Sequence, residues 1–253
     1  MSHQTTDISS QLNHPERDLA LQSIENARDL GGYQTVDGGH TRFGVFVRTA
    51  DMDRVVEADR VAMRDHGISL VIDLRMQRER EEKPNLFSRG SLGDPAFRVH
   101  DFWGDRFDTY RSPDRSAPPA KKLADLYCAG LQASDFVMAE IIRSLASAEG
   151  AAAFHCRSGK DRTGLVAAML LSIARIHRDV ICADFSLTEQ YLQSDAINPI
   201  ELTAPGAWQR TCAPETMRMT LDFIDESYGD VPSYLIQAGV SEQELIAIRK
   251  KFV

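Results

Sequence analysis

The sequence predicts an α/β fold, and two observations support that prediction. Short apolar runs of strand length alternate along the chain with stretches of helical periodicity. The chain has 253 residues, of which 43% are hydrophobic and 26% charged, as is usual for a soluble α/β domain that buries a sizeable core. We therefore expect one domain over residues 20–253, preceded by a flexible leader over residues 1–19 that lacks apolar periodicity.

The first half of the chain supplies three predicted elements. A glycine pair at positions 31–32 predicts a turn and residues 44–48 read as a strand, so together they indicate an opening hairpin. Helical spacing over residues 58–66 predicts a helix that the following glycine ends. A β-rich apolar run over residues 69–74 predicts a buried strand.

Two polar segments come next. The charged run over residues 75–83 mixes basic and acidic side chains, which is typical of a solvated helix face, so we assign it no partner. Residues 101–120 combine aromatic, acidic and proline residues, which indicates an irregular connection at the border of the functional site.

The second half of the chain contains the most informative junction. Residues 121–148 read as helical, residues 150–155 as a short buried strand, and residues 165–176 as an apolar helix. Between that strand and that helix, residues 155–164 read H-C-R-S-G-K-D-R-T-G. The sequence therefore predicts a strand–loop–helix junction.

Charge and cysteine usage exclude several classes of protein. A formal net charge of −8 and a pI near 5.4 argue against a broad surface for nucleic acid or anionic lipid, so any anion site must be local. The four cysteines, at positions 128, 156, 182 and 212, form no C-x-x-C pair or His/Cys cluster, so we expect neither a disulfide scaffold nor a metal site. We expect no cofactor.

The N-terminal segment and the hydropathy of the chain indicate where in the cell the protein is expected. The N-terminal segment lacks the basic and apolar regions of a signal peptide, and no run of eighteen apolar residues occurs. We therefore expect a cytoplasmic protein without integral membrane association, while secretion by a route without a cleaved signal stays open. The sequence does not indicate an oligomeric state.

The junction has the features of an anion-binding site. Loop N–H groups can converge into a concave nest, and the helix N-terminus adds its dipole, so a phosphate dianion can bind without a metal. Gly159 lets the backbone curl close to such a ligand.

Three side chains of the junction fit phosphoryl transfer. Cys156 stands first in the loop, where the positive field favours a thiolate, so we expect it to be the nucleophile. Arg162 can hold two phosphoryl oxygens with its planar fork, more tightly as charge builds in the transition state. Thr163 can donate to the departing thiolate, and Ser158 is a weaker candidate for that role.

Each of these residues also has a structural interpretation, and two other kinds of anion-binding loop need comparison. Taken singly, a buried cysteine before an apolar helix is commonly inert, and a threonine there is commonly a cap. A nucleotide-binding loop of the Walker type fits poorly, because position 154 is Phe and Lys160 precedes Asp. Two rivals remain: a phosphate-binding module without turnover, and a rhodanese-like sulfurtransferase, against which the R-T-G helix start argues.

Three motifs together resemble one family. Residues 155–164 match the pattern H-C-x-x-G-K-D-R-T-G, residues 26–32 match N-x-R-D-L-G-G, and residues 73–75 read D-L-R at a strand end. The chain thus resembles the protein tyrosine phosphatase superfamily, and within it the atypical bacterial branch, from about residue 20 to the C-terminus.

The resemblance implies a fold and a mechanism. It implies a mostly parallel central sheet flanked by helices and a two-step, metal-free hydrolysis through a phosphocysteine on Cys156. Asp161 corresponds to a general acid, and Asp101, Asp105 and Asp108 are the alternatives on the aromatic-rich segment. The other loop residues expected to bind the substrate phosphate are Arg157, Ser158, Gly159, Lys160 and Thr163, and Lys160 also resembles the loop lysine of lipid-directed phosphatases.

The expected substrate is a phosphorylated protein. Phosphotyrosine leads, phosphoserine and phosphothreonine are secondary, and phosphoinositide is the alternative. Supporting roles fall to His155, which we expect to brace the loop, and to Asp29, Asp73 and Arg75. These last three, with Arg28 and Arg48, either position the loop or tie elements together as buried ion pairs.

Overall fold

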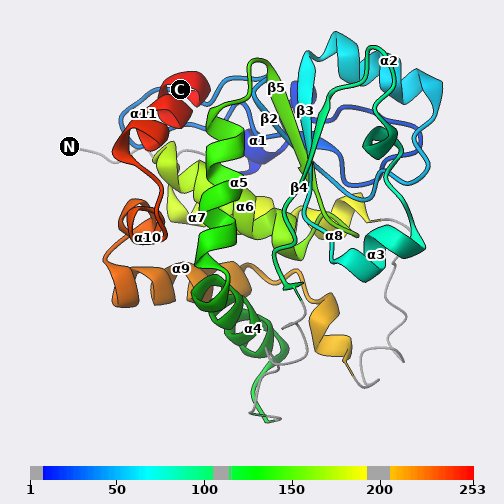
Figure 1. Ribbon diagram of the computed structural model, residues 1–253. Helices are drawn as coiled ribbons and strands as arrows, with labels where there is room; N and C mark the ends of the chain where they lie inside the picture. The colour runs from blue at the N-terminus through cyan, green and yellow to red at the C-terminus, as the bar shows by residue number, and fades with distance from the viewer. Residues whose placement is uncertain (1–7, 105–113, 115, 193–205) are drawn as a thin grey trace.

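A five-stranded sheet forms the centre of the molecule (Figure 1), in a computed structural model that describes residues 8–104, 114, 116–192 and 206–253. The strand order is β1 (Arg28–Asp29), β2 (Phe46–Thr49), β5 (Ala151–His155), β3 (Ile68–Asp73) and β4 (Ala96–Val99). Only β1 pairs antiparallel, with β2, and the other three pairings are parallel. The predicted α/β fold with a mostly parallel central sheet is thus confirmed.

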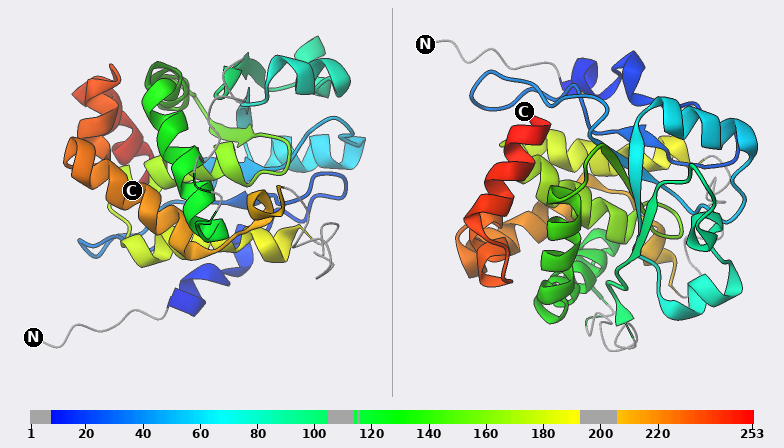
Figure 2. Two further views of the ribbon diagram at one scale, coloured as in Figure 1. Left: turned by 90° about the horizontal axis from the view of Figure 1, so that it is seen from below. Right: turned by 45° about the horizontal axis from the view of Figure 1, so that its top comes forward.

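Helices cover both faces of the sheet (Figures 1 and 2). Most of the larger helices lie on one face, while α2 and the 3₁₀ helix η2 lie on the other. After β5, the last strand in sequence, the first helix is α6, and the predicted loop lies between the two. The helices are α1 (Ile8–Leu12), α2 (Glu57–Asp65), α3 (Gln77–Glu82), α4 (Pro119–Ala133), α5 (Asp135–Ala146), α6 (Asp161–Ile173), α7 (Arg178–Ser186), α8 (Thr188–Tyr191), α9 (Pro214–Tyr228), α10 (Val231–Gln237) and α11 (Glu242–Phe252), with the short 3₁₀ helices η1 (Pro15–Arg17), η2 (Leu86–Arg89) and η6 (Ala207–Arg210).

The two cores follow from the alternation of side chains along each strand. Phe46 and Phe154 face the larger helical layer, whereas their neighbours Val47 and Ala153 face α2. All five residues of β5 are buried, which explains why this strand reads as a continuous apolar run without alternation.

The register of the parallel strands positions the site. Thr49 of β2 and Asp73 of β3 both pair with His155 of β5, so these three strands end at one edge of the sheet. In an open α/β sheet, ligands bind at the carboxyl ends of the strands. The loop after β5 therefore lies where such a site is expected.

Residues 8–17, which lie within the predicted leader, contain two short helices. They form α1 and η1, and Arg17 is buried, with its guanidinium 3.8 Å from the ring centroid of Tyr33. Arg17 also donates to the carbonyl oxygens of Gln11 (2.8 Å) and Asp29 (3.1 Å). Buried Arg17 anchors this segment together with Ile8 and Leu12, which pack against the core, and so short an apolar pattern gives a weak periodic signal. Residues 1–7 lie outside the described residues.

Two further elements differ from the expectation. Strand β4 was not predicted, because it lies at the sheet edge with three of its four residues exposed and so lacks an apolar run. The helical region over residues 121–148 consists of two helices, α4 and α5, that meet at Ser134. Among the helices that the structure describes, none combines the length and the apolar character that crossing a membrane requires.

Candidate active site

The loop between β5 and α6 runs from Cys156 to Lys160. Cys156 is buried at its head, with 1% of its surface exposed. Gly159 has a φ of +69°, and a Cβ at that position would lie 2.5 Å from the carbonyl oxygen of Thr49. Only glycine fits there, so the close curl predicted for the loop is present.

Three consecutive loop carbonyls are tied to the scaffold. The backbone N–H of Asp51 donates to the carbonyl of Arg157 (3.1 Å), Asn26 Nδ2 donates to that of Ser158 (2.9 Å), and Arg48 Nη2 donates to that of Gly159 (2.8 Å). Because a trans peptide points its N–H opposite to its C=O, the next three N–H groups point away from the scaffold. That arrangement is compatible with the predicted anion nest, which stays a prediction.

A buried ion cluster orients Arg48, one of the three donors that bond the loop carbonyls; we call these three hydrogen bonds the carbonyl clamps. Asp184 of α7 lies 3.2 Å from Arg28 Nε and 2.5 Å from Arg48 Nη1, and it accepts a hydrogen bond from the Tyr33 hydroxyl (2.9 Å). Burial alone would raise the pKa of Asp184, but the two arginines outweigh it and hold that pKa far below its ordinary value. The carboxylate thus stays charged and keeps Arg48 aimed at the loop.

Arg162 lies in the first turn of α6 and is gripped by Glu79 of α3. Its Nη1 and Nη2 lie 2.5 Å and 2.9 Å from the two carboxylate oxygens of Glu79, and Nη1 lies 3.4 Å from the carbonyl of Leu74. Although burial favours the neutral guanidine, negative charge at Cys156 and Glu79 raises the pKa of Arg162 above its ordinary value. The fork is therefore held in one orientation and stays charged.

Helix α3, within the charged run over residues 75–83, has no buried residue, as a solvated face predicts, but the expectation that the run has no partner is wrong. Glu79 binds Arg162, and Arg75 is buried, with its Nη2 2.7 Å from Asp73 Oδ2 and its Nη1 2.8 Å from Asp51. A mixture of charges along a helix does not show whether its ion pairs form within the helix or with other parts of the chain. The structure is therefore needed to identify these partners.

His155 braces the loop. It is fully buried, its Nδ1 lies 3.1 Å from the carbonyl oxygen of Cys156, and its Nε2 lies 2.8 Å from Asn85 Nδ2. Burial lowers the pKa of His155, so the ring is neutral, and this pattern fits a proton on Nδ1. Asp29 is occupied elsewhere: it accepts from the N–H groups of Gly31 (2.6 Å) and Gly44 (2.8 Å) and fastens the hairpin.

Asp161 and Lys160 are placed by neighbours outside the loop. The Tyr127 hydroxyl of α4 donates to Asp161 Oδ1 (2.5 Å), and Lys160 Nζ lies 3.4 Å from the same oxygen. Lys160 is 5% exposed and donates to the carbonyls of Gln209 and Thr211, the latter at 3.4 Å. These contacts direct the ammonium toward the η6 segment, while its predicted role in binding phosphate stays a prediction.

The alternative acids are placed differently. Asp101 accepts from the backbone N–H groups of Gln77 (2.9 Å), the first residue of α3, and of Gly104 (2.8 Å), so both its oxygens have backbone partners. Asp105 and Asp108 lie outside the described residues. Among the described candidates, only Asp161 lines the pocket beside the loop.

A pocket of about 440 Å³ opens at this loop. Its lining combines charged side chains, among them Arg157 and Arg162, with apolar ones such as Leu123 and Leu126. Its lining residues are Met76, Arg78, Glu79, Glu82, Trp103, Leu123, Leu126, Arg157, Asp161, Arg162 and Gln209. A pocket with an apolar lining and a few convergent polar groups is typical of a site for a small group or side chain.

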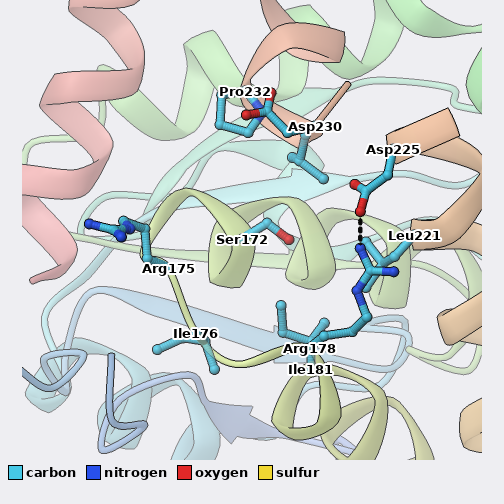
Figure 3. A pocket seen from close by; sticks show the side chains of 10 residues that line it. Ser172, Arg175, Ile176, Arg178, Ile181, Leu221, Asp225, Asp230 and Pro232 are labelled. Atoms are coloured by element: carbon cyan, nitrogen blue, oxygen red, sulfur yellow. Dashed lines mark hydrogen bonds and ion pairs between the residues drawn. The ribbon is translucent and has the colours of Figure 1, made fainter. Parts of the chain in front are cut away.

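A second pocket, of about 320 Å³, lies among α6, α7, α9 and α10 and contains no loop residue (Figure 3). Figure 3 shows Arg178 directed at Asp225, and Arg178 also pairs with Asp222. Arg175 lies 3.4 Å from Asp37. Because these cations have carboxylate partners, the second pocket lacks the excess positive charge of an anion site.

Comparison with known proteins places this site in a class. Residues 19–253 match the model of the tyrosine phosphatase family. A tyrosine-protein phosphatase of Nostoc commune is 30% identical over 213 residues, which cover 79% of this chain and 71% of the relative. The triple specificity protein phosphatase PtpB of Mycobacterium tuberculosis is 31% identical over 119 residues, covering 38% of this chain and 41% of the relative. The crystal structure of P. aeruginosa TpbA has a TM-score of 0.35 at 16% identity, covering 77% of this chain and 86% of the other.

The protein is a phosphoric monoester hydrolase. More narrowly, the chain belongs to the tyrosine phosphatase family, so the binding-only and sulfurtransferase alternatives are set aside.

Proposed function

We propose that this enzyme hydrolyses phosphotyrosine in proteins through a phosphocysteine formed on Cys156. The observation that carries this proposal concerns two polar atoms next to the nest. Arg162 Nε and the Thr163 hydroxyl are buried, and neither has a hydrogen-bond partner within the described part of the chain. Buried polar atoms are nearly always paired, so these two suit a bound phosphate and the thiolate respectively.

In the first step, the Cys156 thiolate attacks phosphorus, the bond from phosphorus to the tyrosine oxygen breaks, and Asp161 protonates the leaving oxygen. The loop N–H groups and Arg162, through its unpaired Nε, bind the equatorial oxygens as their charge grows. In the second step, Asp161 takes a proton from water, the water oxygen attacks phosphorus, and the thiolate leaves with a hydrogen bond from Thr163.

Phosphoinositide is the second candidate substrate. Two exposed cations, Arg78 and Arg157, line the same pocket as Arg162 and suit further anionic groups of a ligand. The name of the mycobacterial relative, a triple specificity protein phosphatase, also supports testing phosphoserine and phosphothreonine.

A turnover panel tests the proposed function. It compares a phosphotyrosine peptide with phosphoserine and phosphothreonine peptides of the same sequence and with short-chain phosphoinositides. We expect the highest kcat/KM for phosphotyrosine, because an apolar ring suits a pocket whose lining includes Met76, Leu123 and Leu126 beside the loop. A higher kcat/KM for phosphoinositide would replace the proposal with the second candidate.

Asp161→Asn tests the general acid. General acid catalysis matters most when the leaving oxygen is basic, so we expect kcat for phenyl phosphate to fall by about 10²-fold and kcat for para-nitrophenyl phosphate to fall far less. The alkaline limb of the kcat–pH profile should flatten as well. Steady-state kinetics on both substrates measure the difference.

The control for that experiment is Asp101→Asn, which changes a carboxylate that bonds backbone N–H groups of Gln77 and Gly104 and does not line the pocket. It should leave the ratio of the two rates unchanged. The assignment of Asp161 fails if Asp161→Asn slows both substrates equally while Asp101→Asn, Asp105→Asn or Asp108→Asn shows the dependence on leaving group.

A further inference from the structure

Tyr127 of α4 bonds the end of the loop from the interior of the protein. None of its surface is exposed, and among the described residues of α4 it is Leu123 and Leu126 that line the pocket. Its ring packs edge-on against Phe185 of α7, with ring centroids 6.2 Å apart. Its hydroxyl donates to Asp161 Oδ1 at 2.5 Å. Packing thus fixes the ring, and the hydroxyl is directed at the first residue of α6.

The two carboxyl oxygens of Asp161 have different surroundings. Oδ1 accepts from Tyr127 and lies 3.4 Å from Lys160 Nζ, whereas Oδ2 accepts no hydrogen bond from the described part of the chain. The Asp161 side chain is 29% exposed and lines the pocket. Because Tyr127 is buried, it holds Oδ1 on the interior side, and Oδ2 is the oxygen left for the pocket.

The same contacts decide which oxygen carries the proton of the acid. Burial, and next the negative charge of Asp161, raise the pKa of Tyr127 well above its ordinary value, so the phenol stays protonated and remains a donor. The ammonium of Lys160 can only donate. These two donors favour an unprotonated oxygen at Oδ1, so the proton of the carboxylic acid belongs on Oδ2.

A buried hydroxyl needs a partner wherever it lies, so the bond alone does not give Tyr127 a role. Tyr234 of α10 shows the ordinary case: it is also buried, and its hydroxyl donates to the carbonyl oxygen of Leu131 at 2.8 Å. That bond ends on the backbone of α4, whereas the bond of Tyr127 ends on the side chain assigned as the general acid. The two tyrosines therefore form a matched pair.

We propose that Tyr127 is a positioning residue for the general acid: it holds Oδ1 of Asp161 so that the protonated Oδ2 faces the leaving oxygen of the substrate. The inference rests on the proposed function and deepens it. In the first step Oδ2 gives its proton to that oxygen as the bond from phosphorus to oxygen breaks, and in the second step the same Oδ2 takes a proton from the attacking water. Without the phenol the carboxyl group can rotate about its Cβ–Cγ bond, and fewer of its orientations reach the leaving oxygen.

Tyr127→Phe tests the inference because it removes the hydroxyl and keeps the ring contact with Phe185. The measured quantity is the ratio of kcat/KM for phenyl phosphate to kcat/KM for para-nitrophenyl phosphate, whose leaving group needs little acid catalysis. We expect this ratio to fall by about tenfold, which is less than the loss of the acid itself would cost. The inhibition constant of inorganic phosphate, which has no leaving group to protonate, should change by less than about twofold.

Tyr234→Phe is the matched control. It removes the same hydroxyl from another buried tyrosine whose bond also ends on α4, so it should leave the ratio unchanged. A double-mutant cycle completes the test. In the Asp161→Asn background no acid remains to be oriented, so Tyr127→Phe should alter the phenyl phosphate kcat/KM by less than about twofold.

Two outcomes would overturn the inference. One is that Tyr127→Phe leaves the ratio of the two substrates unchanged, whether or not both are slowed, and the other is that it costs the same with and without Asp161. Both leave the proposed function intact as long as Asp161→Asn alone shows the dependence on leaving group. If Asp161→Asn lacks that dependence, or if wild-type enzyme fails to hydrolyse the phosphotyrosine peptide, the proposed function itself fails, so the two failures are distinguishable.

Discussion

The Cys156→Ser variant should lose turnover by on the order of 10⁴-fold or more, as is usual when a covalent nucleophile is removed. It should still bind tungstate, a phosphate analogue. A serine hydroxyl is a much weaker nucleophile than a cysteine thiolate, so the nucleophile is lost. The carbonyl clamps from Asn26 and Arg48 do not involve the sulfur, so the nest remains. Single-turnover kinetics and calorimetric titration with tungstate measure the two properties.

Cys182→Ser is the matched control. Cys182 is also buried, but it lies in α7, and burial raises the pKa of its thiol to about 11. That thiol is therefore protonated at neutral pH, and its replacement should leave kcat nearly unchanged. The mechanism is wrong if Cys156→Ser retains activity within tenfold of the wild type.

Arg162→Lys should lower kcat/KM by on the order of 10³-fold although the charge is kept. Glu79 engages Nη1 and Nη2, while Nε is buried without a partner among the described residues. A lysine ammonium is a point charge and cannot bind the carboxylate and a phosphoryl oxygen in this fixed geometry. The loss should appear in kcat as well as in tungstate affinity.

Arg157→Lys provides the comparison at the exposed position of the loop. Because the scaffold contacts the carbonyl of Arg157 and not its guanidinium, this change should cost no more than a few-fold in kcat/KM. Equal effects of Arg162→Lys and Arg157→Lys would show that the loop needs only positive charge and would remove the bidentate role of Arg162.

Much of the fold could be predicted because its central elements are periodic. Strands β2, β3 and β5 are buried on both faces and read as apolar runs, and α2 and α6 have helical spacing. The elements that the sequence did not predict have a weaker apolar pattern. Strand β4 lies at an exposed edge, and residues 8–17 are anchored by buried Arg17 and by two apolar side chains, Ile8 and Leu12.

The candidate site also contains residues that the sequence predicts and residues that it does not. The loop residues from Cys156 to Thr163 could be proposed because they are contiguous and each has a distinct chemical role. The residues that orient the site are distant in sequence from their partners. Glu79 is 83 residues from Arg162, and Tyr127 is 34 residues from Asp161. Asp184 is 156 residues from Arg28. No local pattern separates them from ordinary surface residues, and only the folded chain brings them to the loop.

The carbonyl clamps on residues 157–159 also link catalytic competence to the integrity of the N-terminal hairpin. Asn26 and Arg48 reach the loop across 132 and 111 residues of sequence. If the β1–β2 hairpin opened while β3, β5 and α6 stayed intact, the carbonyls of Ser158 and Gly159 would lose their hydrogen bonds. The peptide groups of the loop could then rotate. Activity would then vanish at temperatures or denaturant concentrations where most of the secondary structure survives. Enzymatic inactivation should therefore precede global unfolding, and phosphate analogues should delay it by holding the nest together.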